Sequence, residues 1–465
     1  MPMHSLLFVF WKEKARSNFV HWEAMTTQTP ISILVVGGGV AGPSLGISLK
    51  KLGMPANITI IEAYPKADPE NIIGSYFTLQ DNGADALKTL GVFEEVRSAG
   101  VDTTASNMMR GDGKVLAKMP FGNSVTVKRG KVNMILMDAA ERAGCTVRYA
   151  TKLIATEQKP HPTDSSKHVV LATFGDGSQE TYDLVVGADG VHSSLRTTID
   201  PQNAPAGRYV GLVNYAGVAP PPPTELKANM TPCAWNFCFA LKAFILYHVR
   251  PDGHIIWGVN EPRGRVSKEE RDAMTEVSAR KYLIELFADD KNPLITHMLS
   301  HGPIELMGDN QCDLGNVPKW FNDEKTIVLV GDAVHAPSPT SGQGGSMALE
   351  DGIVLAKALH ENPNSIGAAL EAYEAFRRAR VEKIVANGAR MSKNKMPGKI
   401  GRFVRDLMMP LVAKCVDMAE LNNWVCAYRI IWDLPLSQQP AAPTTSMRKV
   451  FFGGGAGSKK ATSTQ

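Results

Sequence analysis

Three glycines stand where an apolar segment meets a predicted helix near the beginning of the chain. Residues 31–36 read Ile-Ser-Ile-Leu-Val-Val, a nearly continuous apolar run typical of a buried parallel strand. Gly37, Gly39 and Gly42 follow it. At this spacing the glycines allow a tight turn, let a pyrophosphate approach the backbone, and let the helix pack close to the strand. The pattern predicts that the positive end of a helix over residues 41–52 binds the phosphates of a dinucleotide.

An acidic residue ends the second strand of the same unit. Residues 58–61 are again apolar, and Glu62 comes twenty positions after Gly42. A carboxylate at this place can accept hydrogen bonds from the hydroxyl groups of a ribose, and it repels a 2′-phosphate. Because strand, helix, second strand and acid occur together, a chance cluster of glycines in a loop is the weaker interpretation.

Two later segments have the composition of nucleotide-binding turns. Residues 183–190 read Asp-Leu-Val-Val-Gly-Ala-Asp-Gly, and residues 331–335 read Gly-Asp-Ala-Val-His. A glycine-rich turn follows the second of these segments and leads into a predicted helix; its glycines include Gly342, Gly344 and Gly345. Backbone N–H groups at such a helix start can bind the polar edge of a ligand and stabilise negative charge on it. A long ligand held at several points, such as FAD, would explain why the three segments are so far apart in the chain.

The composition is that of an ordinary globular protein. The chain has 465 residues, a formal net charge of +4, 44% hydrophobic residues and 21% charged residues. So small a net charge does not favour nucleic-acid binding, and the basic stretch 393–405 is interpreted as a solvated surface. Six cysteines occur without a C-x-x-C pair. They predict neither a metal site nor a disulfide framework, and they suit a reducing, cytoplasmic compartment.

The middle of the chain is predicted to form an antiparallel sheet that contacts the substrate. Residues 234–239, 244–249 and 254–259 are strand-like, and Pro-Asp-Gly at 251–253 predicts a hairpin between the last two. These runs are rich in aromatic residues, which suit a flat apolar ligand, although any single aromatic residue is more often part of a core. The candidates for the substrate face are Asn214, Tyr215, Trp235 and Phe237.

Together these features predict an α/β protein, with a Rossmann-like FAD-binding domain, an inserted antiparallel substrate sheet and a C-terminal helical region. The apolar run at residues 6–11 is too short to span a membrane, and Met25 is an alternative start. The predicted parts are an N-terminal extension (1–30), the first part of the FAD-binding domain (31–205), the substrate domain (206–318), the second part of the FAD-binding domain (319–375), C-terminal helices (376–435) and a disordered tail (436–465).

With these motifs the chain resembles the FAD-dependent aromatic-hydroxylase family, which are single-component flavoprotein monooxygenases with the para-hydroxybenzoate hydroxylase fold. Tetracycline-modifying, urate-hydroxylating and fungal biosynthetic members look similar. The resemblance implies that Asp332 hydrogen-bonds the ribityl chain of FAD and that Arg129, at a helix start, contacts the cofactor. An arginine there is unfavourable to the helix dipole unless an anion is its partner. Asp189 belongs to a segment linked to FAD and NADPH, and Ser75 aligns with a backbone contact near the flavin.

The resemblance also implies an activity. NADPH or NADH would reduce FAD, and O2 would then give a C4a-hydroperoxide that hydroxylates or epoxidises an aromatic, polyketide-like or alkaloid-like small molecule in secondary metabolism. No catalytic residue is assigned. The resemblance implies that His335 occupies a structural position near the flavin, so it is given no acid–base role. The stretch 209–217 lacks an arginine that some relatives have there.

Alternatives to this activity remain open. Baeyer–Villiger oxidation of the substrate would use the same flavin chemistry. A flavin-dependent reductase would need no O2, and a non-catalytic flavin-binding protein would share the same motifs. A halogenase is disfavoured, because the chain has no Trp-x-Trp element. Core packing of the C-terminal helices is favoured over contact with a membrane.

Overall fold

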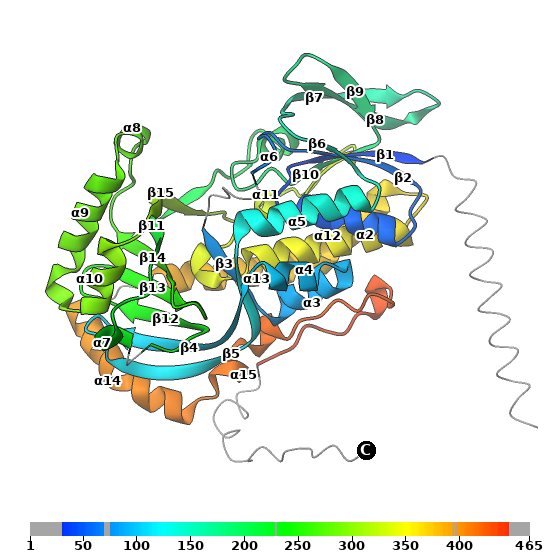
Figure 1. Cartoon of the computed structure of the whole chain (residues 1–465). Coiled ribbons are helices and arrows are strands. Elements are labelled where there is room, and N and C mark those ends of the chain that lie inside the picture. Colours follow the sequence, from blue (N-terminus) through cyan, green and yellow to red (C-terminus); the bar gives the residue numbers. More distant parts are fainter. Residues whose placement is uncertain (1–29, 69–74, 228–229, 394, 396–397, 446–465) are drawn as a thin grey trace, which may run out of the picture.

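The computed structural model describes residues 30–68, 75–227, 230–393, 395 and 398–445 (Figure 1). The predicted N-terminal extension, apart from Pro30, and the last twenty residues of the predicted tail lie outside these ranges. Within them, no helix combines the length and the apolar character that crossing a bilayer requires. The described residues also contain no cluster of three or more His, Cys, Asp or Glu side chains that could hold a metal ion.

A five-stranded parallel sheet forms the first layer of the protein. Its strand order is β16 (Ile327–Leu329), β10 (Leu184–Gly187), β1 (Ile31–Val36), β2 (Ala56–Ile61) and β6 (Thr146–Arg148). Every adjacent pair in this sheet is parallel. Helices α2 (Ala41–Lys51), α5 (Arg129–Arg142) and α12 (Gly344–Glu361) lie against the sheet (Figure 1). This layer confirms the predicted Rossmann-like unit.

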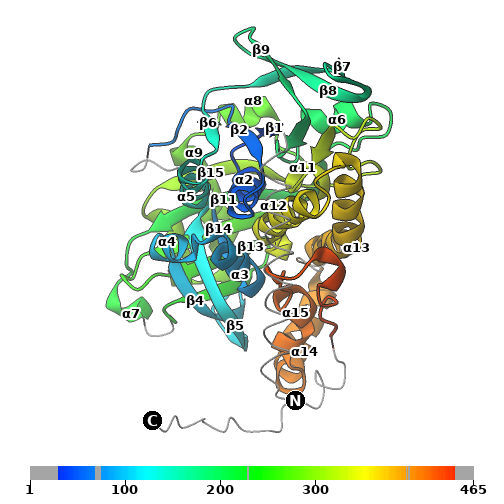
Figure 2. The same ribbon diagram turned by 90° about the vertical axis from the view of Figure 1, so that its right-hand side faces the viewer.

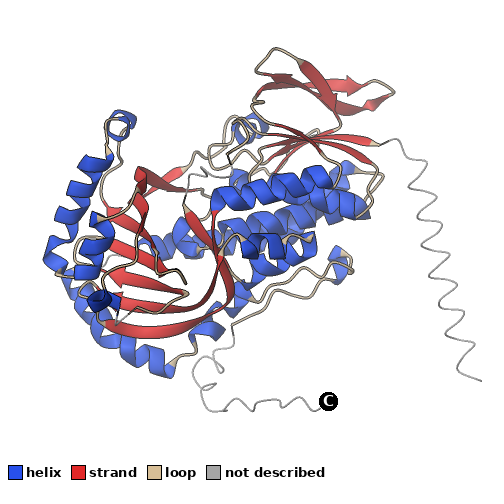
Figure 3. Ribbon diagram, viewed as in Figure 1, coloured by secondary structure: helices blue, strands red, loops and turns tan. Residues whose placement is uncertain are grey.

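An eight-stranded curved sheet forms the second layer (Figure 3). Its order is β15 (Ile304–Asp313), β11 (Arg208–Ala219), β14 (Ile255–Pro262), β13 (Phe244–Val249), β12 (Ala234–Phe239), β4 (Val101–Arg110), β5 (Val115–Lys128) and β3 (Tyr76–Leu79). The hairpin predicted around 251–253 joins β13 and β14.

The sheet differs from the prediction in two respects. Strands β3, β4 and β5 come from residues 76–128, which were assigned to the first part of the FAD-binding domain, so the sheet is not confined to 206–318. The pair β12 and β4 is parallel, because the chain returns to the sheet through a long connection and not a hairpin. The division into domains stays a prediction.

The two faces of this sheet have different environments, because side chains alternate along each strand. One face carries Tyr215, Tyr247 and Trp257, which join a buried core with α9 (Glu276–Phe287) and α10 (Pro293–Ser300). In Figure 1 these two helices cover the outer side of the sheet. The other face is less buried, and Lys395 links it to the turn after the third segment, since its Nζ contacts Asn260 on the sheet and lies 3.4 Å from Oγ1 of Thr340.

The C-terminal helices are α13 (Ile366–Lys393), α14 (Lys399–Cys415) and α15 (Met418–Cys426), and the last two extend away from the parallel sheet (Figure 2). The predicted tail does not begin at 436, because Leu436 is buried and its N–H donates to the Glu361 carboxylate. The remaining elements are the strands β7 (Leu153–His161), β8 (Asp164–Phe174) and β9 (Gln179–Tyr182), the helices α3 (Asp81–Leu90), α4 (Phe93–Ser98), α6 (Ser194–Ile199), α7 (Thr224–Lys227), α8 (Lys268–Asp272) and α11 (Asp332–His335), and the 3₁₀ turns η1 (Ala288–Asp290), η2 (Pro339–Ser341) and η3 (Leu436–Gln438).

Candidate cofactor and substrate site

The three glycines after β1 occupy three different environments. Gly37 has φ of 119°, and a Cβ on it would lie 2.3 Å from the carbonyl oxygen of Ala188. A Cβ on Gly42 would lie 2.3 Å from the carbonyl oxygen of Gly37. A Cβ on Gly39, by contrast, would meet no protein atom within 4 Å. Gly37 and Gly42 therefore allow the turn and the close packing of α2, while Gly39 leaves space for a ligand.

The start of α2 suits an anion. Its first turn has no acidic residue, and no side chain caps its N-terminus. Uncapped N–H groups and the helix dipole both favour a negative ligand group there. Glu62 is held beside this turn, because its Oε2 accepts from the N–H of Gly38 at 2.9 Å and its Oε1 from the N–H of Tyr64 at 3.0 Å. The turn and the acid of the motif are therefore adjacent, as binding of a nucleoside and its phosphates requires.

The third segment packs against the start of α2. A Cβ on Gly331 would lie 3.0 Å from Cβ of Ala41 and 3.5 Å from Cβ of Ala348 on α12. The start of α12 has neither a side-chain cap nor an acid in its first turn. A Cβ on Gly344 would lie 3.6 Å from Oδ1 of Asp332. Two uncapped helix starts and an acidic side chain thus belong to one region.

Arg129 and Ser75 belong to the same region. The N–H of Arg129 donates to the carbonyl oxygen of Ser75 at 3.1 Å, and Nη2 of Arg129 lies 4.0 Å from Oδ2 of Asp332. The Arg129 side chain is 56% exposed and that of Asp332 is 34% exposed, so both retain access for a further partner. An anionic partner would offset the unfavourable position of an arginine at the start of α5.

Strand β3 and the turn after it pack against the start of α12. Gly342 has φ of 62°, in the left-handed region, and a Cβ on it would lie 3.5 Å from Nε2 of Gln80. A Cβ on Gly345 would lie 3.1 Å from the ring of Phe77 on β3. The glycines of the turn after the third segment therefore let the start of α12 approach β3 closely.

The second segment is tied to the third by a buried arginine. Asp189 accepts from the N–H groups of Ser194 and Leu195 through Oδ2 at 2.8 and 3.3 Å, which leaves its Oδ1 without a protein partner. The guanidinium of Arg196 donates to the carbonyl oxygens of Val191 and Ala333 at 2.7 and 2.8 Å. Arg196 therefore joins the turn after β10 to α11, and burial lowers the pKa of its guanidinium.

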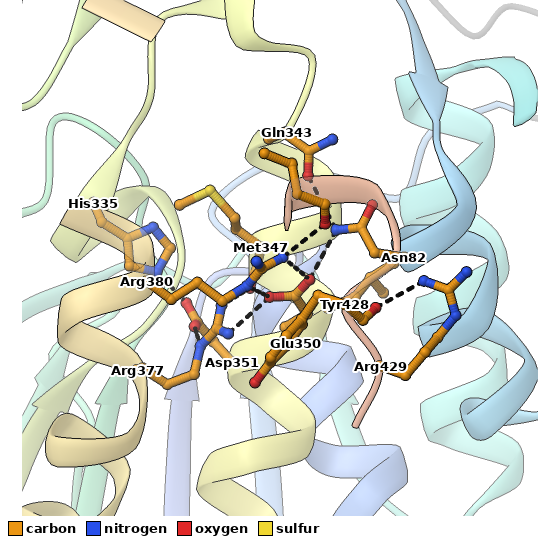
Figure 4. A network of polar contacts seen from close by, with 12 residues as sticks. Asn82, His335, Gln343, Met347, Glu350, Asp351, Arg377, Arg380, Tyr428 and Arg429 are labelled. Carbon is orange, nitrogen blue, oxygen red and sulfur yellow. Dashed lines mark hydrogen bonds and ion pairs between the residues drawn. The ribbon is translucent and has the colours of Figure 1, made fainter. Parts of the chain in front are cut away.

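A buried ionic network joins α12, near its second turn, to α13 and α3 (Figure 4). Arg377 on α13 donates to Oε2 of Glu350 at 2.7 Å and to Oδ1 of Asp351 at 2.8 Å. Arg380 and Asn82 also donate to Glu350. Burial opposes ionisation of both carboxyl groups, but the surrounding positive charges hold the pKa of each below its ordinary value.

His335 belongs to this network as well. Its Nε2 lies 2.5 Å from Oδ2 of Asp351, which also accepts from the N–H of Gly331 at 2.8 Å. His335 is buried, and its ring lies 6.0 Å from that of Trp320. This placement supports the structural role expected for His335. Sequence reasoning gave no role to Glu350, Asp351 or Arg377; the adjacent acids of a buried helix were the only signal for them.

Three of the four substrate candidates share the less buried face of the curved sheet. Asn214 pairs across strands with Asn260, and Asn260 pairs with Phe244. The rings of Trp235 and Phe237 lie 6.2 Å apart, as do those of Phe237 and Phe244. The result is a row of aromatic rings that ends at two amides. Tyr215 is 1% exposed and points into the opposite core, so its placement does not support contact with a substrate.

Lys395 reaches this face from the segment after α13. Its Nζ hydrogen-bonds Oδ1 of Asn260, lies 3.4 Å from Oγ1 of Thr340, and sits 4.2 Å from the centre of the Phe244 ring. Burial alone lowers the pKa of Lys395 to about 7. The interpretation of 393–405 as a solvated surface is therefore wrong for Lys395, because the fold turns it inward between the sheet and η2.

A family model described as FAD binding domain matches residues 30–388. The chain belongs to this family. The curated relatives of this flavoprotein include the aurachin C monooxygenase/isomerase of Stigmatella aurantiaca, which is 25% identical and is matched over 81% of this chain and 91% of its own length. They also include the FAD-dependent urate hydroxylase of Mycolicibacterium vanbaalenii, 26% identical, with 76% and 86% covered.

Solved structures agree on the fold of the flavoprotein. Klebsiella pneumoniae HpxO, complexed with FAD and uric acid, is 20% identical, with a TM-score of 0.67 over 82% of this chain and 93% of that chain. These relatives are named as a monooxygenase/isomerase and as an FAD-dependent hydroxylase, and with the FAD-binding family match the chain is an oxidoreductase of the FAD-dependent monooxygenase class. The aromatic-hydroxylase family and the cofactor FAD expected from the motifs are both confirmed.

Proposed function

We propose that this flavoprotein uses NADPH or NADH and O2 to hydroxylate or epoxidise an aromatic or polycyclic small molecule in secondary metabolism, in the cytoplasm. One observation supports this proposal independently of the family match. The aromatic row of the curved sheet ends at Lys395, which contacts Thr340 in the turn before α12. A substrate on this row would lie between the sheet and the flavin-binding turn. When bound, FAD would take up the electrons of NADPH or NADH and pass them to O2, which activates the oxygen that enters the substrate.

The residues of the three segments would hold the cofactor. The open side of Gly39 and the uncapped start of α2 suit the pyrophosphate. Glu62 suits the ribose hydroxyls, and Arg129 with Asp332 suits the polar middle of the cofactor. The start of α12 would then place its N–H groups and dipole where they can stabilise negative charge on the ring system.

Lys395 favours a substrate that carries an acidic oxygen. Its ammonium group is buried, and no carboxylate contributes to its lowered pKa. A phenolate or carboxylate of the substrate would supply the missing negative charge and restore the ordinary pKa. The rings of Trp235 and Phe237 would stack on the aromatic part of the same molecule. Relatives named for urate, 6-hydroxynicotinate and 3-hydroxybenzoate support an acidic aromatic substrate.

The test is substrate-stimulated NADPH oxidation by the FAD-loaded protein, with a panel of aromatic acids and their neutral esters, with and without O2. We expect stimulation by an acid, an oxygenated product only with O2, and loss of the preference for acids in Lys395→Met. Lys393→Met is the matched control, because Lys393 is exposed. A product formed without O2 would indicate a reductase, and no stimulation by any compound would indicate a flavin-binding protein without turnover.

A further inference from the structure

Helix α14 exposes a continuous apolar stripe. Of the fifteen large apolar side chains that are exposed among the described residues, seven lie on this helix, and no residue of α14 is buried. Ile400 is 83% exposed and Phe403 is 70% exposed. The spacing of three and four positions places all seven on one side of the helix. They are Ile400, Phe403, Val404, Leu407, Met408, Leu411 and Val412.

The polar side of the same helix faces the protein. Arg402 donates to the carbonyl oxygen of Leu241, and the guanidinium of Arg405 lies 4.4 Å from the centre of the Phe239 ring while pairing with Asp406. The helix is therefore oriented opposite to an ordinary surface helix, whose apolar side faces the core. The prediction that the C-terminal helices pack into the core does not hold for this face of α14. An apolar face of this size on a folded protein marks an interaction surface.

Cations flank the stripe at both ends. Lys399 begins the helix next to Ile400, Lys414 follows Val412, and both lysines are exposed. The one acidic residue of α14, Asp406, is already paired with Arg405. An apolar stripe between lysines complements a lipid surface, where side chains enter the acyl region and ammonium groups meet anionic headgroups.

A second copy of the chain fits this surface less well. In a twofold antiparallel contact between two α14 helices, Lys399 of each copy would face Lys414 of the other. In a parallel contact, each lysine would face its own equivalent. Both arrangements bring like charges together at the ends of the stripe, whereas anionic lipids neutralise all of them.

We propose that the exposed face of α14 docks this flavoprotein on the anionic surface of a lipid bilayer, lying in the interface without crossing it. The interaction would keep the protein beside a reservoir of apolar compounds. It is independent of the proposed substrate chemistry, because the stripe and the aromatic row lie on different elements.

The experiment is flotation of the full-length, FAD-loaded protein with phosphatidylcholine vesicles that contain or lack phosphatidylserine. The wild type is expected to float with the anionic vesicles. Phe403→Glu combined with Leu411→Glu should lower the bound fraction at least about tenfold, because two charges enter the acyl boundary. Lys399→Glu combined with Lys414→Glu should remove the preference for phosphatidylserine.

The matched control is Val277→Glu combined with Ile154→Glu, since both side chains are also exposed but lie elsewhere. It should float like the wild type. Flavin absorbance and thermal unfolding of each variant show that it is folded. The proposal is overturned if folded wild type does not bind either vesicle, or if the control loses binding as the α14 variant does. It is also overturned if Phe403→Glu with Leu411→Glu only converts a dimer to a monomer in sedimentation.

Discussion

The guanidinium of Arg129 lies 4.0 Å from the carboxylate of Asp332, although the two residues begin different helices in distant parts of the chain. Each of them stands at a helix N-terminus, where the backbone favours negative charge. Asp332 satisfies that preference and Arg129 does not. The unfavourable interaction of the Arg129 charge with the N-terminus of α5 is therefore offset only when a further anionic or polar group binds beside Arg129. We assign this position to FAD.

Replacing Arg129 with Met should weaken FAD binding and leave the fold intact. A charged hydrogen bond contributes about 1.5–3 kcal/mol, so the dissociation constant should rise roughly tenfold to a hundredfold. Flavin fluorescence during titration of the apoprotein measures the change. Arg142→Met is the control, because Arg142 ends the same helix and pairs with Glu95 at the surface. Equal FAD affinity in wild type and Arg129→Met would contradict the assignment.

The glycine turn offers a pair of substitutions with opposite consequences. Ala at position 42 brings Cβ within 2.3 Å of the Gly37 carbonyl oxygen and should destabilise the apoprotein by about 1–3 kcal/mol. Ala at position 39 meets no protein atom within 4 Å, so apoprotein stability should be unchanged. Its Cβ enters the space left for the pyrophosphate, and FAD affinity should fall about tenfold or more.

Urea unfolding of the apoprotein and FAD titration separate these two effects. Gly264→Ala is the control, because Gly264 is exposed and a Cβ there also meets no atom within 4 Å. It should change neither quantity. Normal FAD affinity in Gly39→Ala would show that the open side of Gly39 does not face the cofactor.

The sequence alone was sufficient for the parts of the site that are encoded locally. The strand, the glycines and the helix of residues 31–52 are consecutive, so their types and spacing carry the whole geometry. The same holds for Asp332 and the turn that follows it. The buried ionic network around Glu350 could not be predicted, because Arg377 and Asn82 contact Glu350 from two separate helices. Only the tertiary fold brings these three side chains together.

The sequence pattern does not predict which face of the curved sheet contacts the substrate. Asn214 and Tyr215 are adjacent on β11, so they must point to opposite faces, but composition does not say which face meets the cofactor. The pairing of β11 with β14 and the packing of α9 and α10 determine that Tyr215 faces the core and Asn214 the opposite side. Lys395 was missed for a similar reason. It belongs to a basic stretch, and only its contact with Asn260 in the folded protein shows that its side chain lies inward.

Removal of the Arg377 side chain as Arg377→Met should destabilise the protein strongly. Glu350 and Asp351 would keep their charges in a buried site with fewer partners, which costs about 3–5 kcal/mol. Denaturant unfolding measures the difference in the free energy of unfolding. Lys319→Met removes an exposed ion pair with Asp323 and should have little effect. Similar stabilities for these two variants would mean that the buried network does not support α12.

Lys395 predicts a pH-dependent stability difference. Its pKa is about 7 in the folded protein and 10.5 ordinarily, so between these values the unfolded chain holds a proton that the folded chain lacks. The free energy of unfolding of the wild type relative to Lys395→Met should therefore rise from pH 7 toward pH 10.5, by at most about 1.4 kcal/mol per pH unit. Unfolding at pH 6.5 and 9.5 tests this, with Lys393→Met as the control. A difference that is constant with pH would place Lys395 in solvent.

Substitutions at Asn214 and Tyr215 test which face of the curved sheet meets the substrate. Asn214→Leu removes the amide oxygen that accepts from Asn260 at 2.7 Å and changes the end of the aromatic row, so KM for an acidic substrate should rise about tenfold. Tyr215→Phe removes a hydroxyl buried on the side of α9 and α10, away from the aromatic row, so neither kcat nor KM should change. Both are measured as stimulated NADPH oxidation. If Tyr215→Phe alters KM while Asn214→Leu does not, the substrate binds on the side of α9 and α10, and the aromatic row that ends at Lys395 has another role.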